Sequence, residues 1–326
     1  MILDILFVIL GAALVLFGAD KLTDGSVGVA RRFSISEMVI GLTIVAFGTS
    51  LPEFVVSLLA SINGSPAMSV GNIVGSNLFN TLAIVGCTAL VGTIAIPHST
   101  IVKDIPFVIL ASVALFAVAC DSLLGGSSSA DTIGRGDGLV LLAFFSIFMY
   151  STIKLAMNKV VVPPEQNDGE TSDNKAPMPV WKMVVFIVFG LAALIGGGEL
   201  FVEGASGLAR SLGVSDAVIG LTLVAGGTSL PELATSVIAA RKGQSGMAIG
   251  NVLGSNLFNI FWILGACSLI RPLPVEGITW VDFSVLLASA LLFWLFSRTR
   301  HRITRGEGFI LVACYLVYLG WLIYSI

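Results

Sequence analysis

Long apolar stretches separated by short polar loops run from one end of the chain to the other. An α-helix needs about 20 predominantly apolar residues to cross a bilayer, and the stretches reach that length with few charges. The first and sixth are long enough that we expect them to tilt or to extend beyond the hydrocarbon. The pattern predicts an all-α membrane protein of ten spans, at residues 3–32, 37–62, 67–93, 104–121, 132–157, 179–211, 216–241, 246–271, 279–297 and 306–325.

One long polar segment interrupts this pattern near the middle of the chain. Residues 158–178 are rich in Pro, Asp, Glu and Asn, as flexible linkers are, and too short for a regulatory domain. They also lack the D-x-D-x-D-G pattern of a calcium-binding loop. We therefore expect a first five-helix unit over residues 1–157, a linker over 158–178 and a second five-helix unit over 179–326.

The composition agrees with a membrane protein. The chain is 56% hydrophobic and only 11% charged, whereas soluble domains carry about a quarter charged residues. Its net charge of −3 gives no reason to expect nucleic acid, and we identify no obligate protein partner or cofactor. No cationic segment precedes the first apolar run, so we expect no cleaved signal peptide and a retained first span.

The basic residues predict how the chain lies in the plasma membrane. If the N-terminus is outside, the inner loops contain Arg31, Arg32, Lys103, Lys154, Lys159, Lys175, Lys182, Arg241, Lys242, Arg298, Arg300, Arg302 and Arg305. The outer loops then contain Arg135, Arg210 and Arg271. Because basic residues accumulate in cytoplasmic loops, we expect both termini outside and the linker in the cytoplasm.

The same polar sequence occurs twice in the chain. GLTIVAFGTSLPE at 41–53 matches GLTLVAGGTSLPE at 220–232, and GNIVGSNLFN at 71–80 matches GNVLGSNLFN at 250–259. The offset is 179 residues throughout, and 23 of the 40 positions from 41 to 80 are identical to their counterparts. Five spans per unit is an odd number, so the second unit must enter the membrane from the opposite face. The duplication thus predicts two inverted repeats, the architecture of alternating-access transporters.

Each copy of the first motif carries an acid within its span, Glu53 and Glu232. An ionised carboxylate in hydrocarbon costs several kcal/mol, and no Lys or Arg lies at comparable depth in these helices. A bound cation is the simplest partner for the two acids.

The residues around Glu53 and Glu232 predict broken helices. Glycine and proline flank both acids, at Gly48, Pro52, Gly227 and Pro231, and a break frees main-chain carbonyls that can bind hard cations. An alternative is that Ser50 and Glu53 form a capping box, which would satisfy only the first amides of a half-helix. Two inverted copies favour a shared cation site over capping as the whole explanation.

The second motif adds hydroxyl and carboxamide groups on neighbouring helices. Its glycines, spaced as G-x-x-x-G, are explained by close helix packing. Its asparagines are not, because an amide buried without partners is unfavourable. The resulting donor set contains oxygen and neither His nor Cys, which suits Ca²⁺, Na⁺ or Mg²⁺ and argues against zinc or copper. The polar residues are Ser76, Asn77 and Asn80 with their counterparts Ser255, Asn256 and Asn259.

The two long helices carry a weaker repeated signal. Asp20 and Asp24 in the first match Glu199 and Glu203 in the sixth, with the same spacing of four residues. A solvated helix face or a structural polar patch is the simpler interpretation, and a route for cations is the alternative. Repeated glycines, Gly25 and Gly28 matching Gly204 and Gly207, predict smooth helix surfaces, and we expect both helices to move against the rest.

With GTSLPE and GSNLFN in both halves, the chain resembles the sodium/calcium exchangers of the Ca²⁺/cation antiporter superfamily, in particular their compact prokaryotic members. The resemblance implies exchange of extracellular Na⁺ for cytosolic Ca²⁺ by two inverted five-helix repeats. It implies Ca²⁺ ligation by Glu53 and Glu232 with the main-chain carbonyls of Thr49 and Thr228. It also implies Na⁺ positions formed by the Ala46 and Ala225 carbonyls and by the hydroxyls of Ser50, Ser229, Ser76, Ser255, Thr49 and Thr228, with Asn80 and Asn259 lining the centre.

Two positions bear on the coupling ion. Some relatives, including potassium-dependent exchangers, have Asp where this chain has Asn259, so we expect no K⁺ requirement. The proton-coupled branch typically has an acid inside the G-N motif, and here the segments 71–75 and 250–254 contain none. This favours Na⁺ over H⁺, with a proton-coupled exchanger as the alternative.

Other function classes fit less well. The two histidines, His98 and His301, lie in loops, and the chain has neither an H-E-x-x-H nor a G-x-S-x-G motif, so we expect no enzymatic activity. A passive cation channel could use the same oxygens as a filter. Saturable flux that requires a counter-ion would distinguish an exchanger from a channel.

Overall fold

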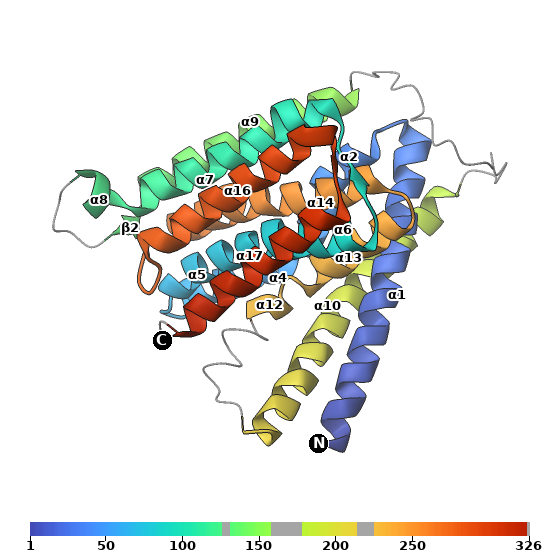
Figure 1. Ribbon diagram of the computed structural model, residues 1–326, viewed down its shortest axis with the longest axis horizontal. Coiled ribbons are helices and arrows are strands. Elements are labelled where there is room, and N and C mark those ends of the chain that lie inside the picture. Colours follow the sequence, from blue (N-terminus) through green and yellow to red (C-terminus); the bar gives the residue numbers. More distant parts are fainter. Residues whose placement is uncertain (126–130, 158–177, 214–224, 325–326) are drawn as a thin grey trace.

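The computed structural model describes residues 1–125, 131–157, 178–213 and 225–324, and this part of the chain is almost entirely helical (Figure 1). The first half contains α1 (Ile2–Phe33), α2 (Glu37–Ile40), η1 (Gly41–Val45), α3 (Ala46–Thr49), α4 (Leu51–Ile62), α5 (Ala67–Leu78), η2 (Phe79–Ile84), α6 (Val85–Val91), β1 (Ile94–Ala95), η3 (Thr100–Asp104), α7 (Ile105–Ala119), α8 (Asp121–Gly125), β2 (Thr132–Ile133) and α9 (Arg135–Met157). The second half contains α10 (Val180–Ser211), α12 (Ala225–Gly227), α13 (Leu230–Arg241), α14 (Ser245–Leu257), η5 (Phe258–Leu264), α15 (Gly265–Ile270), β3 (Leu273–Pro274), α16 (Trp280–Arg300), β4 (Arg302–Ile303) and α17 (Arg305–Tyr324). The segments labelled η are π-helical.

Eight described helices are long and apolar enough to cross a membrane. They are Ile2–Phe33, Ala67–Val91, Thr100–Ala119, Arg135–Met157, Val180–Ser211, Ser245–Ile270, Trp280–Arg300 and Arg305–Tyr324. A ninth is added if Glu37–Thr49 and Leu51–Ile62, which meet at a 45° bend, count as one span. The prediction of an all-helical, multi-pass membrane protein is confirmed. The seventh predicted span, 216–241, begins outside the described residues. Nearly all of the predicted linker, 158–178, also lies outside them.

Local sequence signals mark several helix ends. Thr279 and Asp282 form a capping box that begins α16, and the Ser36 hydroxyl accepts from the Val39 amide at the start of α2. Ser34 and His301 take the left-handed conformation that ends α1 and α16. The fourth predicted span begins earlier than expected, at Thr100 rather than residue 104, because a π-helical turn precedes α7.

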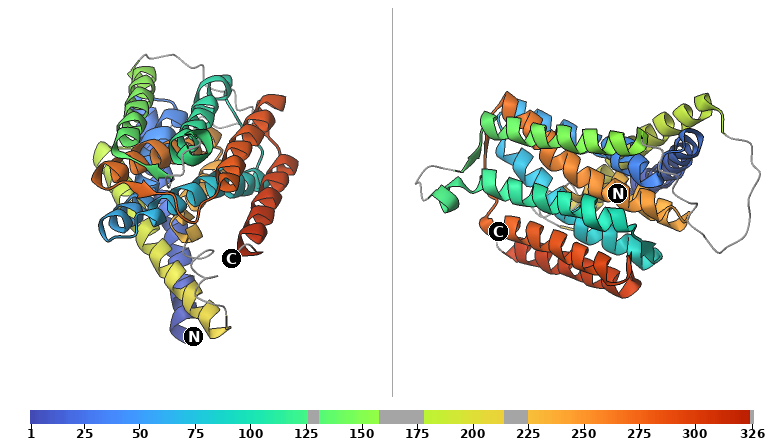
Figure 2. Two further views of the ribbon diagram at one scale, coloured as in Figure 1. Left: turned by 90° about the vertical axis from the view of Figure 1, so that its left-hand side faces the viewer. Right: turned by 90° about the horizontal axis from the view of Figure 1, so that it is seen from above.

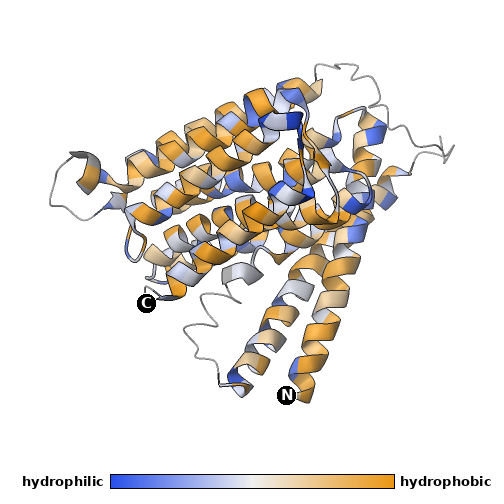
Figure 3. Cartoon of the chain, viewed as in Figure 1, coloured by the Kyte–Doolittle hydropathy of each residue, from blue (hydrophilic) through white to orange (hydrophobic). Residues whose placement is uncertain are grey.

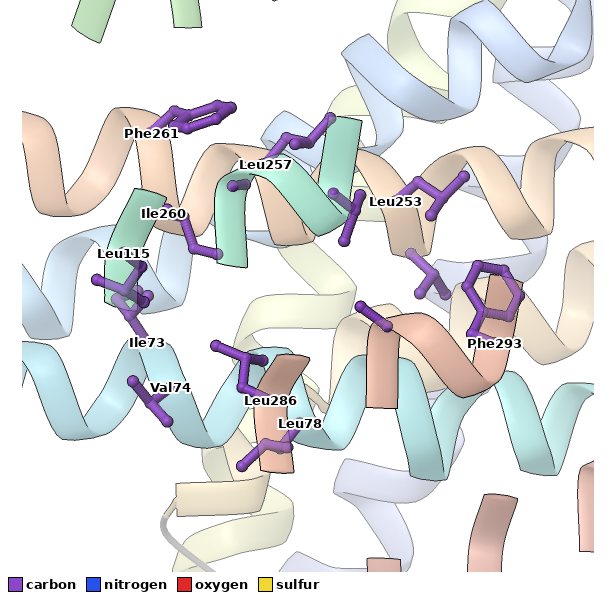
Figure 4. Close-up of a cluster of buried hydrophobic side chains, with 14 of the residues drawn as sticks. Ile73, Val74, Leu78, Leu115, Leu253, Leu257, Ile260, Phe261, Leu286 and Phe293 are labelled. Carbon is purple, nitrogen blue, oxygen red and sulfur yellow. The ribbon is translucent and has the colours of Figure 1, made fainter. Parts of the chain in front are cut away.

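The apolar core surrounds the two helices that carry the GSNLFN motif. Helices α5 and α14 are deeply buried, and α7 and α16 cover them with side chains such as Leu115 and Phe293 (Figure 4). Exposed apolar side chains also lie on the outer helices α1, α9, α10 and α17, which are largely hydrophobic along their length (Figure 3). Such an exterior fits a hydrocarbon environment.

Helices α1 and α10 pack along each other and project beyond the remaining helices (Figure 1). Their glycines permit this close approach, because a Cβ at Gly18 would lie 2.6 Å from the Gly190 carbonyl oxygen and one at Gly197 would lie 2.9 Å from the Gly11 carbonyl oxygen. The repeated glycines at Gly25 and Gly204 belong to this same α1–α10 contact. They therefore join the two long helices closely to each other.

Two short antiparallel ladders connect the halves of the chain (Figure 2). In the first, β1 pairs with β4, with Ile94 opposite Ile303. In the second, β2 pairs with β3, with Ile133 opposite Leu273. Each ladder takes one strand from each half, so the outer helices α7, α9, α16 and α17 are tied together across the two units.

Candidate functional site

Both helices that carry an acid are broken immediately before it. In the first half α3 ends at Thr49 and α4 begins at Leu51, with Pro52 in its first turn. In the second half α12 ends at Gly227 and α13 begins at Leu230, with Pro231 in its first turn. The break follows from proline, which has no amide hydrogen for the preceding turn. The predicted breaks are confirmed on the described residues.

The serines at these breaks bond across the molecule rather than to their own helices. Ser229 donates to Oε1 of Glu53 at 2.8 Å, and Ser50 donates to Oε1 of Glu232 at 3.1 Å. Neither serine makes a side-chain cap for the helix it precedes. The capping-box alternative is therefore wrong for both copies, and the reciprocal bonds bring the two acids into one site.

The two carboxyl groups are removed from solvent, since Glu53 and Glu232 are each only 1% exposed. Ser255 makes a further, longer bond to Glu232, at 3.4 Å. These bonds to the carboxyl groups all come from serine hydroxyls, and no Lys, Arg or His pairs with either group among the described residues. Two buried acids without a protein cation need protonation or a bound cation to be stable.

Thr49 and Ala46 lie beside this pair. The Thr49 hydroxyl donates to Oδ1 of Asn251 at 3.1 Å, so it also connects the two halves. The Ala46 carbonyl accepts from the Ser50 amide at 3.0 Å, with a longer contact of 3.4 Å from the Thr49 hydroxyl. Thr228 follows α12 directly and Ala225 begins it, in the positions that match Thr49 and Ala46.

The predicted carboxamides form a network between the halves. Asn259 donates to Oδ1 of Asn77 at 2.9 Å, and Asn80 donates to Oδ1 of Asn256 at 3.1 Å. Asn80 and Asn259 lie in the π-helical segments η2 and η5. Such segments occur frequently at functional sites, because the wider turn changes which side chains point inward.

Five buried oxygens of the predicted ligands lack any hydrogen-bond donor. Buried polar atoms are nearly always paired, so unpaired oxygens on residues that bond across the two halves indicate a missing partner. All five are acceptors, and they come from both halves. They are Oε2 of Glu53, Oε2 of Glu232, Oγ of Ser76, Oδ1 of Asn80 and Oδ1 of Asn259. Oxygen-only donors of this kind suit a hard cation, and the described residues hold no group of three or more His, Cys, Asp or Glu side chains that would suit a transition metal.

Sequence reasoning missed a second layer of asparagines. Asn72 donates to the Glu53 carbonyl at 3.4 Å and to the Ser57 hydroxyl at 3.0 Å. Asn251 makes the equivalent bonds to the Glu232 carbonyl, at 3.4 Å, and to the Ser236 hydroxyl, at 3.0 Å. Both asparagines belong to the repeated G-N motif, so their identity in the two copies was a signal that could have found them.

The acidic pair on α1 has local partners. Lys242, at the end of α13, lies 2.6 Å from Asp20 and 2.7 Å from Asp24, and Lys21 lies 2.8 Å from Asp20. These contacts form a polar patch between α1 and α13, as the simpler interpretation proposed. The matching acids on α10 are exposed and form no ion pair with another described residue.

Comparisons with known proteins support one family. The family model for sodium/calcium exchanger proteins matches residues 3–154 and 182–324. The inner membrane protein YrbG of Escherichia coli is 34% identical over 99% of this chain and 97% of its own. The sodium/calcium exchanger MaX1 of Methanosarcina acetivorans is 32% identical over 98% of this chain and 99% of its own.

A solved structure shows the same architecture. The sodium-calcium exchanger NCX_Mj, in a form soaked with Na⁺ and without Ca²⁺, superimposes with a TM-score of 0.81 at 35% identity. The match covers 98% of each chain. The chain therefore belongs to the sodium/calcium exchanger family of membrane transporters.

Proposed function

We propose that this protein is a secondary active antiporter that exchanges Na⁺ for Ca²⁺ by alternating access. The observation that carries the proposal is the group of five unpaired buried oxygens, which includes one carboxylate oxygen from each half. A cation placed among them would satisfy these acceptors and the charges of Glu53 and Glu232 together. Membership of the exchanger family supports both ions as substrates.

The proposed Ca²⁺ ligands are Glu53 and Glu232 with the main-chain carbonyls of Thr49 and Thr228. Na⁺ would bind at adjoining positions formed by the Ala46 and Ala225 carbonyls and by the hydroxyls of the serines and threonines predicted above, with Asn80 and Asn259 at the centre. The reciprocal Ser50–Glu232 and Ser229–Glu53 bonds support a single site shared by both halves.

The proposed architecture is ten spans in two inverted units, residues 1–157 and 179–326. Contacts that recur at the 179-residue offset support it, since Asn72 and Asn251 bind equivalent groups in their own halves. Both termini would lie outside the plasma membrane and the 158–178 linker in the cytoplasm, according to the distribution of basic residues.

The proposed moving part is the α1–α10 pair. Glycine contacts join these helices closely, so they can move as one body against the helices that carry the ligands. Helix α10 also lies against the first break, because a Cβ at Gly48 would lie 2.6 Å from the Leu191 side chain. Movement of the pair would thus expose the site on one face and cover it on the other.

The test is ⁴⁵Ca²⁺ uptake into proteoliposomes that contain Na⁺, K⁺ or a proton gradient. We expect uptake from an outward Na⁺ gradient, saturation with Ca²⁺ and no requirement for K⁺. Uptake driven only by the proton gradient would identify a proton-coupled exchanger instead. Ca²⁺ flux without any counter-ion would identify a channel and overturn the proposal.

A further inference from the structure

The two central carboxamides present one end of each amide to the site. Asn80 and Asn259 are each 1% exposed, and both have Oδ1 unpaired while Nδ2 is bonded to an asparagine of the other half. An amide reversed at either position would direct two N–H groups at the site in place of an oxygen. The orientation therefore matters for any cation bound there.

The orientation of Asn80 is determined by two residues in series. Its Nδ2 donates to Oδ1 of Asn256 at 3.1 Å, and Nδ2 of Asn256 donates to the Thr81 hydroxyl at 2.9 Å. With its nitrogen bonded to Thr81, Asn256 can only accept from Asn80. Thr81 has no hydroxyl counterpart in the second half, where Ile260 occupies the matching position.

The orientation of Asn259 is determined through a different pair of bonds. Its Nδ2 donates to Oδ1 of Asn77 at 2.9 Å, and Nδ2 of Asn77 donates to the main-chain carbonyl of Asn256 at 3.2 Å. Asn256 thus orients Asn80 directly, through its side-chain oxygen. It orients Asn259 indirectly, because its main-chain carbonyl accepts from Asn77, which in turn accepts from Asn259. Both paths end with a carboxamide oxygen left free of donors.

We propose that Asn77, Asn256 and Thr81 are positioning residues that direct the Asn80 and Asn259 oxygens at the transported cation and so favour Ca²⁺ over Na⁺. The inference rests on the proposed cation site. The interaction of an ion with an oriented dipole scales with the charge of the ion, so a fixed carbonyl oxygen stabilises Ca²⁺ about twice as much as Na⁺ at the same distance. Loss of the orientation should weaken Ca²⁺ binding more than Na⁺ binding.

Thr81→Val is the mildest test, because it keeps the shape and removes one acceptor. Apparent affinities for Ca²⁺ and for Na⁺ are measured on purified protein by calorimetric titration, and in proteoliposomes by ⁴⁵Ca²⁺ uptake. A hydrogen bond contributes about 1 kcal/mol net, so we expect a roughly fivefold loss of Ca²⁺ affinity. Na⁺ affinity should change by less, so that the ratio of the two affinities falls.

Thr88→Val is the matched control. Thr88 lies two turns further along the same helical span and is similarly buried, at 1% exposure against 2% for Thr81, and its hydroxyl has no hydrogen-bond partner. Thr88→Val should leave the affinities for Ca²⁺ and for Na⁺ unchanged. Equal effects of Thr81→Val and Thr88→Val on the affinity ratio would overturn the proposal.

A double-mutant cycle separates orientation from general structural damage. In an Asn80→Asp background both ends of the side chain are oxygens, so orientation is no longer required. Thr81→Val should then change the affinity ratio less than twofold. The same fivefold loss in both backgrounds would contradict positioning, while absence of Na⁺-driven uptake in the unmodified protein would contradict the exchange function itself.

Asn77→Leu tests how Asn77 orients Asn259. Its effect is likewise compared between the unmodified protein and an Asn259→Asp background. The expected loss of Ca²⁺ affinity is on the order of tenfold, because the substitution leaves the Asn259 amide without its acceptor. Thermal unfolding of the purified variants shows whether each is folded. An unchanged Ca²⁺/Na⁺ affinity ratio in folded Asn77→Leu protein would exclude this path.

Discussion

At the scale of single residues, Glu53 and Glu232 are the groups on which exchange should depend most. Each carries half of the negative charge of the proposed site, and each is bonded to a serine of the opposite half. We expect Glu53→Gln and Glu232→Gln each to reduce Ca²⁺ uptake at least tenfold, because the isosteric change removes charge that a divalent ion requires.

Glu276→Gln, in an exposed loop, is the control and should leave uptake unchanged. The measurement is ⁴⁵Ca²⁺ uptake into proteoliposomes, with the amount of folded protein matched by gel filtration. Near-normal uptake by folded Glu53→Gln and Glu232→Gln proteins would exclude these acids as Ca²⁺ ligands.

The sequence pointed to those residues of the candidate site that are both polar and duplicated. Glu53, Ser50 and Asn80 recur at a fixed offset, and burial in an apolar chain left a cation as the simplest partner. Thr81 could not be found in this way, because Ile260 occupies its counterpart position and no repeat marks it. Its proposed role rests on a contact with Asn256, 175 residues away, which only the fold creates.

At the scale of helices, proline and glycine predicted where the chain breaks, and both breaks are present. The π-helical segments η2 and η5 were not predicted, because one extra residue in a turn leaves no clear change in the apolar pattern. The glycines of α1 were predicted to form a smooth helix surface, and the structure places them against α10. The spacing of glycines predicts that a helix packs closely against another, but it does not predict which helix is the partner.

The α1–α13 patch provides a test of the moving helices. We expect a bifunctional thiol reagent that joins Asp24→Cys to Lys242→Cys to stop exchange, because it fixes α1 to α13, the helix that carries the proposed ligand Glu232. Ion binding from one face should remain. The two native side chains are 2.7 Å apart, so the substituted cysteines lie within reach of a short reagent.

The matched control joins α1 to α10. A Cβ at Gly207 would lie 2.8 Å from Cγ of Asp4, so Asp4→Cys and Gly207→Cys can form a disulfide. If the two helices move together, this cross-link should leave exchange intact. Both pairs are compared in a background without the four native cysteines. Continued exchange across the α1–α13 cross-link would exclude α1 as the moving element.

At the scale of the whole molecule, an all-helical protein with several membrane spans could be predicted from hydropathy, because the bilayer imposes both length and composition on each span. The way the halves meet could not. The β1–β4 and β2–β3 ladders pair loops more than 130 residues apart in the sequence, and two-residue strands leave no recognisable pattern. These ladders tie together the outer helices around the helices that carry the duplicated motifs.

The charge of the whole site predicts the electrical behaviour of exchange. Two carboxylates neutralise one Ca²⁺ or two Na⁺, so a third Na⁺, as the family resemblance implies, would leave the Na⁺-loaded protein with one excess positive charge. Exchange should then be electrogenic, since each net charge moved across the membrane contributes about 2.3 kcal/mol per 100 mV. In vesicles with Na⁺ inside, an inside-positive potential set with K⁺ and valinomycin should accelerate Ca²⁺ uptake, and an inside-negative one should slow it. Uptake that does not respond to the potential, while still requiring Na⁺, would indicate exchange of two Na⁺ for one Ca²⁺ through the same two acids.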